Sequence, residues 1–360
     1  MATAPLNLEA DVVELTRDIC DIESVSGNEK QLADAIEAAL QKYSHLEVIR
    51  DGDAIVARTN LGRSNRVVIA GHIDTVPVAN NLPVQMLSME REQVLYGRGT
   101  VDMKAGVAVQ LKLAATLTQP TSDVTWIFYD HEEVEAAKNG LGRLARNRPE
   151  LLDASFAVLC EPTSAQVEGG CNGTMRVDLT FSGVKAHSAR PWMGKNAIHG
   201  AANALAILAD YQPAEIDVDG LVYRESLNAV LIGGGIATNV IPDECVVTVN
   251  YRFAPSKSAA DAESHLREVF AGMEMTVMDV AEGARPGLDR AEAKAFVAAT
   301  QTEARPKYGW TDVARFSALG VPAVNFGPGD PSKAHADDEA VPVSQIYSCE
   351  KALRAWLSVG

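Results

Sequence analysis

Three short apolar runs in this chain each end in an acid or an imidazole. The runs at residues 67–70, 124–128 and 156–160 lead into Gly71-His72-Ile73-Asp74, His131-Glu132-Glu133 and Glu161-Pro162. Apolar runs of this length are typical of buried strands. In an open α/β sheet, ligands bind in the crevice beyond the carboxyl ends of the strands. We therefore predict that the three clusters converge in space.

Each cluster also has an ordinary interpretation. His72 beside Asp74 could be a surface pair, and Glu132-Glu133 could begin a solvated helix, because acids are favoured in a first helical turn. A carboxyl group placed just past a buried strand is, however, costly unless it is paired or bound to a metal. Carboxyl groups follow three predicted strands at equivalent positions, which favours one shared site.

Asp102 and the late His335 bring this set to two imidazoles and at least three carboxylates. Nitrogen and oxygen ligands without thiolate suit zinc or a similar divalent ion, and carboxylates can bridge two ions. Two familiar motifs are absent. Position 135 is Glu135, which breaks the His-Glu-x-x-His pattern of zinc proteases, and no Gly-Lys-Ser/Thr follows Gly97 and Gly99 to make a phosphate loop.

The chain has 360 residues and a formal net charge of −16. Its length provides ample core for two domains. The negative charge disfavours nucleic acid and anionic membranes as partners, because both require a basic face. The sequence shows no secretory signal pattern and no apolar run that could span a bilayer, so we expect a cytoplasmic protein. The five cysteines are expected to be buried, reduced thiols.

The first part of the chain alternates predicted strands and helices. Ser26-x-x-Glu29 reads as a capping box that opens a helix with an apolar stripe at Leu32, Ile36 and Leu40. A second, Ala-rich helix is predicted at 104–117. Strands are predicted at 46–50, 54–59, 67–71, 124–130 and 156–160. This alternation predicts an α/β fold with a mostly parallel sheet sandwiched by helices.

The pattern changes beyond residue 172. Strands at 176–181, 227–235, 245–253 and 275–281 and helices at 196–210 and 258–271 follow one another in the β-α-β-β-α-β order of a ferredoxin-like α+β unit. A strand at 321–326 then leads towards His335. We therefore predict a discontinuous domain at 1–172 and 288–360 that carries the candidate metal ligands, with a second domain inserted at 173–287.

Taken together, these motifs resemble the dinuclear zinc amidohydrolase and metallopeptidase family, which includes acetylornithine deacetylase, aminoacylase and the glutamate carboxypeptidases. The likeness covers nearly the whole chain. Its motifs are residues 71–77, 97–104, 132–133, 161–163, 183–188, 239–242 and His335. The segments at 249–255 and 307–313 are similar to those of the actinobacterial members that act on succinylated diaminopimelate.

The resemblance implies two zinc ions per subunit, for which cobalt can substitute. His72 and Glu161 would bind one ion, Glu133 and His335 the other, and Asp102 would bridge them. Two ions about 3.5–4 Å apart can activate a water and polarise an amide carbonyl.

The resemblance also assigns roles beside the metals. Asp74 would orient the imidazole of His72, and Glu132 would be the general base, a function worth roughly 10²–10⁴-fold in rate. Family members usually have a cis peptide after the bridging aspartate, here between Asp102 and Met103.

The same resemblance implies that 1–172 and 288–360 form the zinc-binding catalytic domain and that the insertion at 173–287 is a dimerisation or lid domain. It also implies site roles for four residues of the insertion. His187 would stabilise the oxyanion, reaching the neighbouring subunit's site in a homodimer, although an exposed loop histidine is its ordinary interpretation. Arg252 would clamp a substrate carboxylate with its planar guanidinium. Arg190 and Asn239 are further candidates for substrate contacts.

The resemblance implies hydrolysis of N-succinyl-LL-2,6-diaminopimelate to succinate and LL-2,6-diaminopimelate, a step of lysine and diaminopimelate biosynthesis. The predicted partner is thus a small N-acyl amino acid. Deacetylation of acetylornithine, or hydrolysis of another N-acyl amino acid, is the alternative within the enzyme class. A catalytically idle metal-containing binding protein is the alternative outside it. The presence of Glu132 beside the ligands argues against idleness, because a purely structural metal site has no use for an additional carboxylate there.

Overall fold

The computed structural model describes residues 5–89 and 92–358 of the chain, which form two compact units. The first comprises Met1–Gly169, Pro286–Arg305 and Arg315–Gly360, and the second comprises Gly170–Arg285 and Pro306–Ala314. Sequence analysis had placed the boundaries near 173 and 287. It had also kept 306–314 with the first unit.

The segment 306–314 belongs to the second unit because its polar groups bond there. The backbone oxygen of Lys307 accepts the amide of Asn172 at 3.1 Å, and the indole of Trp310 donates to the backbone oxygen of Glu282 at 3.1 Å. The thiol of Cys171 lies 3.8 Å from the backbone oxygen of Thr311. Such pairings depend on the tertiary fold and leave no pattern in the sequence.

The first unit contains an eight-stranded sheet in the order β1-β2-β6-β3-β7-β18-β8-β17. Its strands are β1 (Glu47–Asp51), β2 (Ala54–Arg58), β3 (Arg66–His72), β6 (Asp123–Tyr129), β7 (Phe156–Leu159), β8 (Glu168–Gly169), β17 (Arg305–Pro306) and β18 (Ala323–Asn325). β3 pairs in parallel with β6 and β7, and β7 pairs in parallel with β18. The β1–β2, β2–β6 and β18–β8 pairs are antiparallel.

The sheet is therefore mixed, with a parallel centre and antiparallel flanks. β6 is buried along its whole length, as expected for a central strand with both faces covered. β1 and β2 are antiparallel because only two residues connect them, and a parallel pair needs a long crossover. The predicted α/β fold with helices on both sides is confirmed, and the parallel part of its sheet is the part that carries the predicted clusters.

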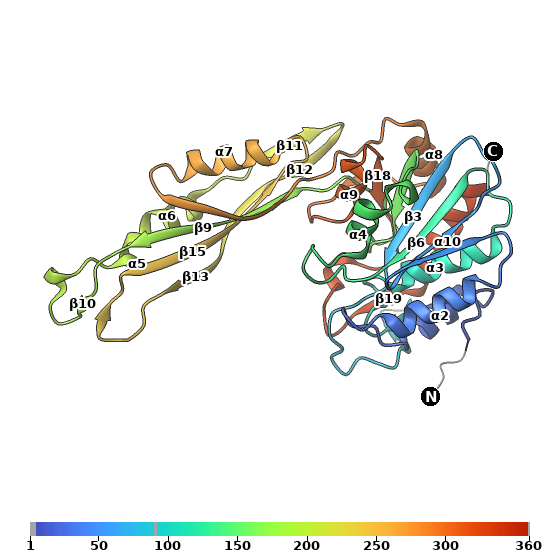
Figure 1. The fold of residues 1–360 in the computed structure, drawn as a ribbon, viewed down its shortest axis with the longest axis horizontal. Coiled ribbons are helices and arrows are strands. Elements are labelled where there is room, and N and C mark those ends of the chain that lie inside the picture. Colours follow the sequence, from blue (N-terminus) through green and yellow to red (C-terminus); the bar gives the residue numbers. More distant parts are fainter. Residues whose placement is uncertain (1–4, 90–91, 359–360) are drawn as a thin grey trace. The chain divides into compact units, whose positions relative to one another are not determined.

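Helices cover both faces of this sheet. They are α1 (Val12–Cys20), α2 (Lys30–Leu40), α3 (Lys104–Thr116), α4 (Gly140–Asn147), α8 (Ala291–Thr300), α9 (Val313–Ala318) and α10 (Val343–Ser358). Figure 1 shows α2, α3 and α10 on one side and α4 and α9 on the other. α3 is buried almost all round, in keeping with its Ala- and Val-rich sequence. None of the helices in the described ranges is both long and apolar enough to cross a membrane.

The first unit contains a hairpin that was not predicted from the sequence. β4 (Gln85–Met89) and β5 (Glu92–Tyr96) pair antiparallel, and β19 (Ala340–Pro342) joins β5 from the far end of the chain. The β5–β19 pairing brings the segment before α3 against the segment after His335. The first of these segments carries Asp102, and the second directly follows the predicted ligand His335.

The second unit contains a four-stranded antiparallel sheet in the order β13-β15-β9-β16. Its elements run β9 (Gly173–Ser182), α5 (Ala197–Gly200), α6 (Ala202–Asp210), β13 (Ser226–Gly234), β15 (Glu244–Phe253), α7 (Ala259–Val269) and β16 (Glu274–Ala281). This is the predicted ferredoxin-like order, with the first helix broken at Ala201.

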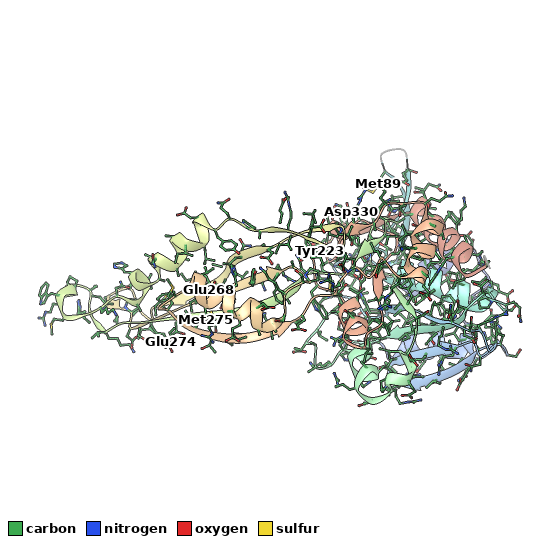
Figure 2. All side chains as sticks on the ribbon, turned by 90° about the horizontal axis from the view of Figure 1, so that it is seen from above. Met89, Tyr223, Glu268, Glu274, Met275 and Asp330 are labelled. Atoms are coloured by element: carbon green, nitrogen blue, oxygen red, sulfur yellow. The ribbon has the colours of Figure 1, made fainter. Side chains whose placement is uncertain are left out.

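One face of this sheet packs against the helices. β16 alternates exposed and half-buried residues, so that Glu274 faces solvent while Met275 packs against the core of the unit (Figure 2). Two small antiparallel pairs complete the unit: β11 (Glu215–Val218) with β12 (Leu221–Arg224), and β10 (Ala186–His187) with β14 (Val240–Ile241).

Candidate functional site

Three neighbouring parallel strands deliver the predicted residues to one edge of the sheet. β3 ends at His72, β6 ends two residues before His131, and β7 ends two residues before Glu161. β3 lies between β6 and β7, in parallel with both, so the three carboxyl ends lie side by side. Glu132 and Glu133 are not helical, because α4 begins only at Gly140. The interpretation of these two acids as a helix start is therefore wrong.

Asp102 lies between two imidazoles from distant parts of the chain. Its Oδ1 is 3.1 Å from Nε2 of His72, and its Oδ2 is 3.4 Å from Nε2 of His335. The Asp102–Met103 peptide is cis, as predicted. A carboxylate whose two oxygens face different imidazoles has the arrangement expected of a bridging ligand.

Each imidazole has a further carboxylate beside it. Nε2 of His335 lies 2.9 Å from Oε2 of Glu133. The ligand atoms of His72, Asp102 and Glu161 lie within 4.8 Å of one another, and so do those of Asp102, Glu133 and His335. The two groups share Asp102. Together they bring all five predicted metal ligands into one cluster.

Asp74 holds the backbone of the segment after β6. Its Oδ1 accepts the amide N–H of Glu132 and its Oδ2 that of Glu133, each at 3.0 Å. Nδ1 of His72 lies 3.0 Å from the backbone oxygen of Asp74 and 3.5 Å from its Oδ1. One fully buried carboxylate thus contacts an imidazole of the cluster and both adjacent glutamates.

Ser26 is a residue of this site that sequence analysis misread. Its hydroxyl donates to Oδ2 of Asp74 at 2.6 Å. Glu29 makes no side-chain cap on α2, and its Oε1 accepts the amides of Gly27 and His131 instead. The predicted capping box is therefore wrong, because a buried carboxylate 48 residues away is a stronger partner for the hydroxyl than a helix amide. The predicted stripe at Leu32, Ile36 and Leu40 is buried.

The carboxylates of the cluster favour positive charge on the two imidazoles that lie beside them. Burial lowers the pKa of His72, but its hydrogen bonds to Asp102 and Asp74 outweigh burial and raise that pKa well above its ordinary value. The hydrogen bonds of His335 to Asp102 and Glu133 raise its pKa to about 10. Protons or a divalent cation can supply this charge, and a cation competes with the protons for the same ligand atoms.

The ligand atoms also fit a metal by their hydrogen bonding. Oε1 of Glu133 is buried and has no hydrogen-bond partner among the described residues. A buried carboxylate oxygen without a donor is costly, and coordination to a cation would remove that cost. Oxygen and nitrogen ligands of this kind suit zinc and similar divalent ions.

The other predicted site residues belong to the second unit. His187 is exposed in β10, opposite Val240 of β14. Arg190 and Asn239 are also exposed and lie in the adjoining loops. Arg252 on β15 is half-buried, and its Nε donates to Oδ1 of Asn250 at 3.1 Å.

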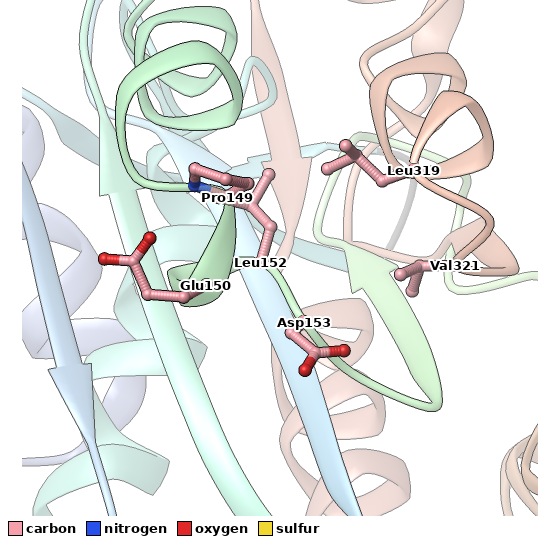
Figure 3. A pocket seen from close by; sticks show the side chains of 6 residues that line it. All are labelled: Pro149, Glu150, Leu152, Asp153, Leu319 and Val321. Carbon is pink, nitrogen blue, oxygen red and sulfur yellow. The ribbon is translucent and has the colours of Figure 1, made fainter.

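A pocket elsewhere in the first unit shares no residue with this cluster. It is lined by Pro149, Glu150, Leu152, Asp153, Leu319 and Val321. Figure 3 shows the carboxylate of Glu150 directed away from Leu319 and Val321. With two acids on a largely aliphatic wall and no imidazole, it has none of the chemistry of the cluster.

A mixed sheet flanked by helices, with carboxylates and imidazoles gathered at the ends of its parallel strands, is typical of metal-dependent hydrolases. The family model described as Peptidase family M20/M25/M40 matches residues 68–358. The chain belongs to this family, and the predicted family is thereby confirmed.

Two relatives resemble the chain over nearly its full length. A Mycobacterium tuberculosis protein described as "Putative succinyl-diaminopimelate desuccinylase DapE" is 52% identical, with 98% of this chain and 99% of that protein covered. The succinyl-diaminopimelate desuccinylase of Corynebacterium glutamicum is 46% identical, with 98% of each covered.

Solved structures share the fold at low sequence identity. A Staphylococcus aureus tripeptidase superposes with a TM-score of 0.78 at 20% identity, over 98% of each chain. A Bacillus subtilis protein described as a dinuclear metal binding peptidase of the M20 family superposes with a TM-score of 0.69 at 16% identity, over 97% of each chain.

Proposed function

We propose that this chain is a metal-dependent amide hydrolase that converts N-succinyl-LL-2,6-diaminopimelate and water into succinate and LL-2,6-diaminopimelate. The observation that carries the proposal is the placement of Asp102 between His72 and His335, each with a further carboxylate beside it. The substrate follows from relatives named succinyl-diaminopimelate desuccinylase at 46–52% identity. The proposal includes the cytoplasmic location expected from the sequence.

The proposed cofactor is a pair of zinc ions, with cobalt able to replace them. His72 and Glu161 would hold one ion, Glu133 and His335 would hold the other, and Asp102 would contribute to both. Support comes from the two ligand groups that share Asp102 and from the buried Glu133 oxygen without a hydrogen-bond donor. When bound, the two ions supply Lewis acidity to the substrate carbonyl and to the attacking water.

Glu132 is the proposed general base. Its carboxylate belongs to the same cluster as His72 and Glu133, within 4.8 Å, and it is half-buried at the site. It takes a proton from the attacking water and returns it to the leaving amine as the amide bond breaks. Asp74 fixes the Glu132 backbone and the ring of His72, so that the base and one ligand keep their relative positions.

Arg252 is the proposed clamp for a substrate carboxylate. Its half-buried guanidinium makes no ion pair with the acids that the structure describes. Burial lowers the pKa of this guanidinium, and an incoming carboxylate would compensate for the lost hydration. Asn239 and Arg190 are proposed as further substrate contacts and His187 as the oxyanion stabiliser.

The proposed assembly is a homodimer formed through the second unit. β13 is an edge strand whose residues are exposed on both faces from Asn228 to Gly234, including Val230, Leu231 and Ile232. A long apolar edge strand favours pairing with another chain. A second copy of the same strand offers a matching edge.

Substrate comparison tests this function. The zinc-loaded protein should release succinate from N-succinyl-LL-2,6-diaminopimelate with a much higher kcat/KM than it releases acetate from N-acetylornithine. The reverse preference would assign the chain to acetylornithine deacetylation. Turnover of neither compound, nor of other N-acyl amino acids, by protein with its zinc bound would indicate an idle binding protein.

A further inference from the structure

Arg98 and Glu339 form an ion pair that takes no part in the proposed chemistry. Nη1 of Arg98 lies 2.7 Å from Oε2 of Glu339, and the two side chains are only 3% and 0% exposed. Arg98 precedes Asp102 by four residues, and Glu339 follows His335 by four. The sequence pattern assigns no role to either residue, because their pairing joins positions 241 residues apart.

Glu339 holds the backbone of the segment that carries Asp102. Its Oε1 accepts the amide N–H of Val101 at 2.8 Å and that of Asp102 at 3.0 Å. Its own backbone oxygen accepts the amide of Gly97 at 3.0 Å. The position of the Asp102 backbone is thus defined by one buried carboxylate.

Arg98 holds two other segments of the site. Its Nη1 donates to the backbone oxygen of Ala336, the neighbour of His335, at 3.2 Å. Its Nε donates to the backbone oxygen of Pro77 at 3.0 Å, in the turn that follows His72 and Asp74. Arg98 lies in the same segment of the chain as Asp102. Its guanidinium therefore connects that segment to the segment after β3 and to the turn around His335.

A buried ion pair is a costly way to stabilise a fold, because apolar residues of similar volume often do as well or better. A guanidinium and a carboxylate, however, can each hold several backbone groups in fixed directions. Side chains that orient metal ligands in this way commonly change metal affinity or activity by about 10–100-fold when they are removed.

We propose that the Arg98–Glu339 pair is a positioning device for the metal centre, which fixes Asp102 relative to His335 and His72 and thereby sets the affinity for metal. This inference rests on the proposed dizinc function. Both residues act through the backbone of ligand-bearing turns, and neither is a proposed metal ligand or substrate contact.

Metal affinity and fold stability separate this role from a purely structural one. The variants are Glu339→Ala, Glu339→Gln and the double variant Arg98→Met/Glu339→Gln, with Asp338→Asn as the control. Asp338 is the exposed neighbour of Glu339 and pairs with Lys333, so its neutralisation changes the charge of the same turn without touching the buried pair. Zinc affinity is measured by competition with a chromophoric chelator, at a temperature where circular dichroism shows every variant folded.

We expect Glu339→Ala to weaken zinc binding by about 10–100-fold and Asp338→Asn to leave it unchanged. Glu339→Gln should have a smaller but measurable effect, because its amide oxygen can still accept the amides of Val101 and Asp102. The double variant should regain melting temperature relative to Glu339→Gln, since no unpaired buried charge remains. It should not regain zinc affinity, since the link to Pro77 and Ala336 is lost.

Wild-type zinc affinity in the folded Glu339→Gln and double variants, with only the melting temperature changed, would overturn the positioning role. Those two variants decide the question if Glu339→Ala does not fold. Failure of the unaltered chain itself to bind zinc would be a different result, because it would remove the proposed function and this inference with it.

Discussion

Glu132 and Glu133 are neighbours in the chain with different proposed tasks. Oε2 of Glu133 lies 2.9 Å from Nε2 of His335, and Glu133 is a proposed metal ligand, whereas Glu132 is the proposed general base. Glu132→Gln should keep the metal content of the wild-type protein and lose about 10²-fold or more in turnover, because a general base is missing. Glu133→Ala should lose metal. Elemental analysis together with an assay of succinate release measures both effects.

The reverse pattern would be loss of metal from Glu132→Gln and unimpaired turnover in Glu133→Ala. That result would make Glu132 the metal ligand and exclude the ligand role of Glu133. Glu135→Gln is the matched control. Glu135 is exposed and pairs with Lys138, so neither metal content nor turnover should change.

The hydroxyls of Ser26 and Ser24 make hydrogen bonds of equal length, one to a charged acceptor and the other to a neutral acceptor. Ser26 donates to the carboxylate of Asp74 at 2.6 Å, and Ser24 donates to the backbone oxygen of Ile73 at 2.6 Å. Ser26→Ala should lower the free energy of unfolding by about 1.5–3 kcal/mol and Ser24→Ala by about 0.5–1.5 kcal/mol. Urea denaturation provides both values. A larger loss of unfolding free energy in Ser24→Ala than in Ser26→Ala would show that the hydrogen bond from Ser26 to Asp74 is not the stronger of the two.

Residues at strand ends could be predicted from the sequence, and those that act across the fold could not. His72, Glu133 and Glu161 each follow an apolar run, so a local pattern identifies them. Ser26 and Glu339 have no such signal, because their partners lie 48 and about 240 residues away in the chain. Their roles depend on the packing of segments that no local pattern relates.

At the scale of elements, strand and helix positions followed from hydrophobic periodicity, whereas pairing at the sheet margins did not. The buried runs at β3, β6 and β7 and the alternation in β9 and β15 were predicted closely. The β4–β5 hairpin has mostly exposed strands, so its sequence carries little periodic signal.

The apolar edge of β13 leads to a prediction about assembly. Leu231 is 69% exposed on this strand, and a lysine there should oppose edge-to-edge pairing with a second copy. Leu231→Lys should be monomeric at concentrations where the wild-type protein is dimeric, as measured by analytical ultracentrifugation.

Met278→Lys is the control for this substitution. Met278 is 56% exposed on β16, the opposite edge of the same sheet, so its replacement should leave the dimer intact. A dimeric Leu231→Lys protein, or a monomeric wild-type protein, would rule out assembly through β13.

At the scale of the whole molecule, the predicted site residues are divided between two compact units. The metal cluster lies in the first unit, and His187 lies in the second. If His187 completes the site of a partner subunit, His187→Ala should lower turnover by about 10²–10³-fold with zinc still bound, the usual effect of losing one oxyanion donor.

Subunit exchange tests whether that site is shared. A heterodimer of His187→Ala with Glu132→Ala contains one site with Glu132 from one chain and His187 from the other. Mixing the two inactive proteins should therefore restore part of the activity. Heterodimers that form without any recovery would place the action of His187 within its own chain.

The proposed function depends on a dinuclear metal centre formed by His72, Asp102, Glu133, Glu161 and His335. The most direct measurement is a zinc titration of chelator-treated protein, followed simultaneously by bound metal and by succinate release from N-succinyl-LL-2,6-diaminopimelate. We expect no turnover without metal, binding of two zinc ions per chain, and recovery of activity as they bind, with cobalt able to replace zinc. Full turnover by the metal-free protein would contradict the claim.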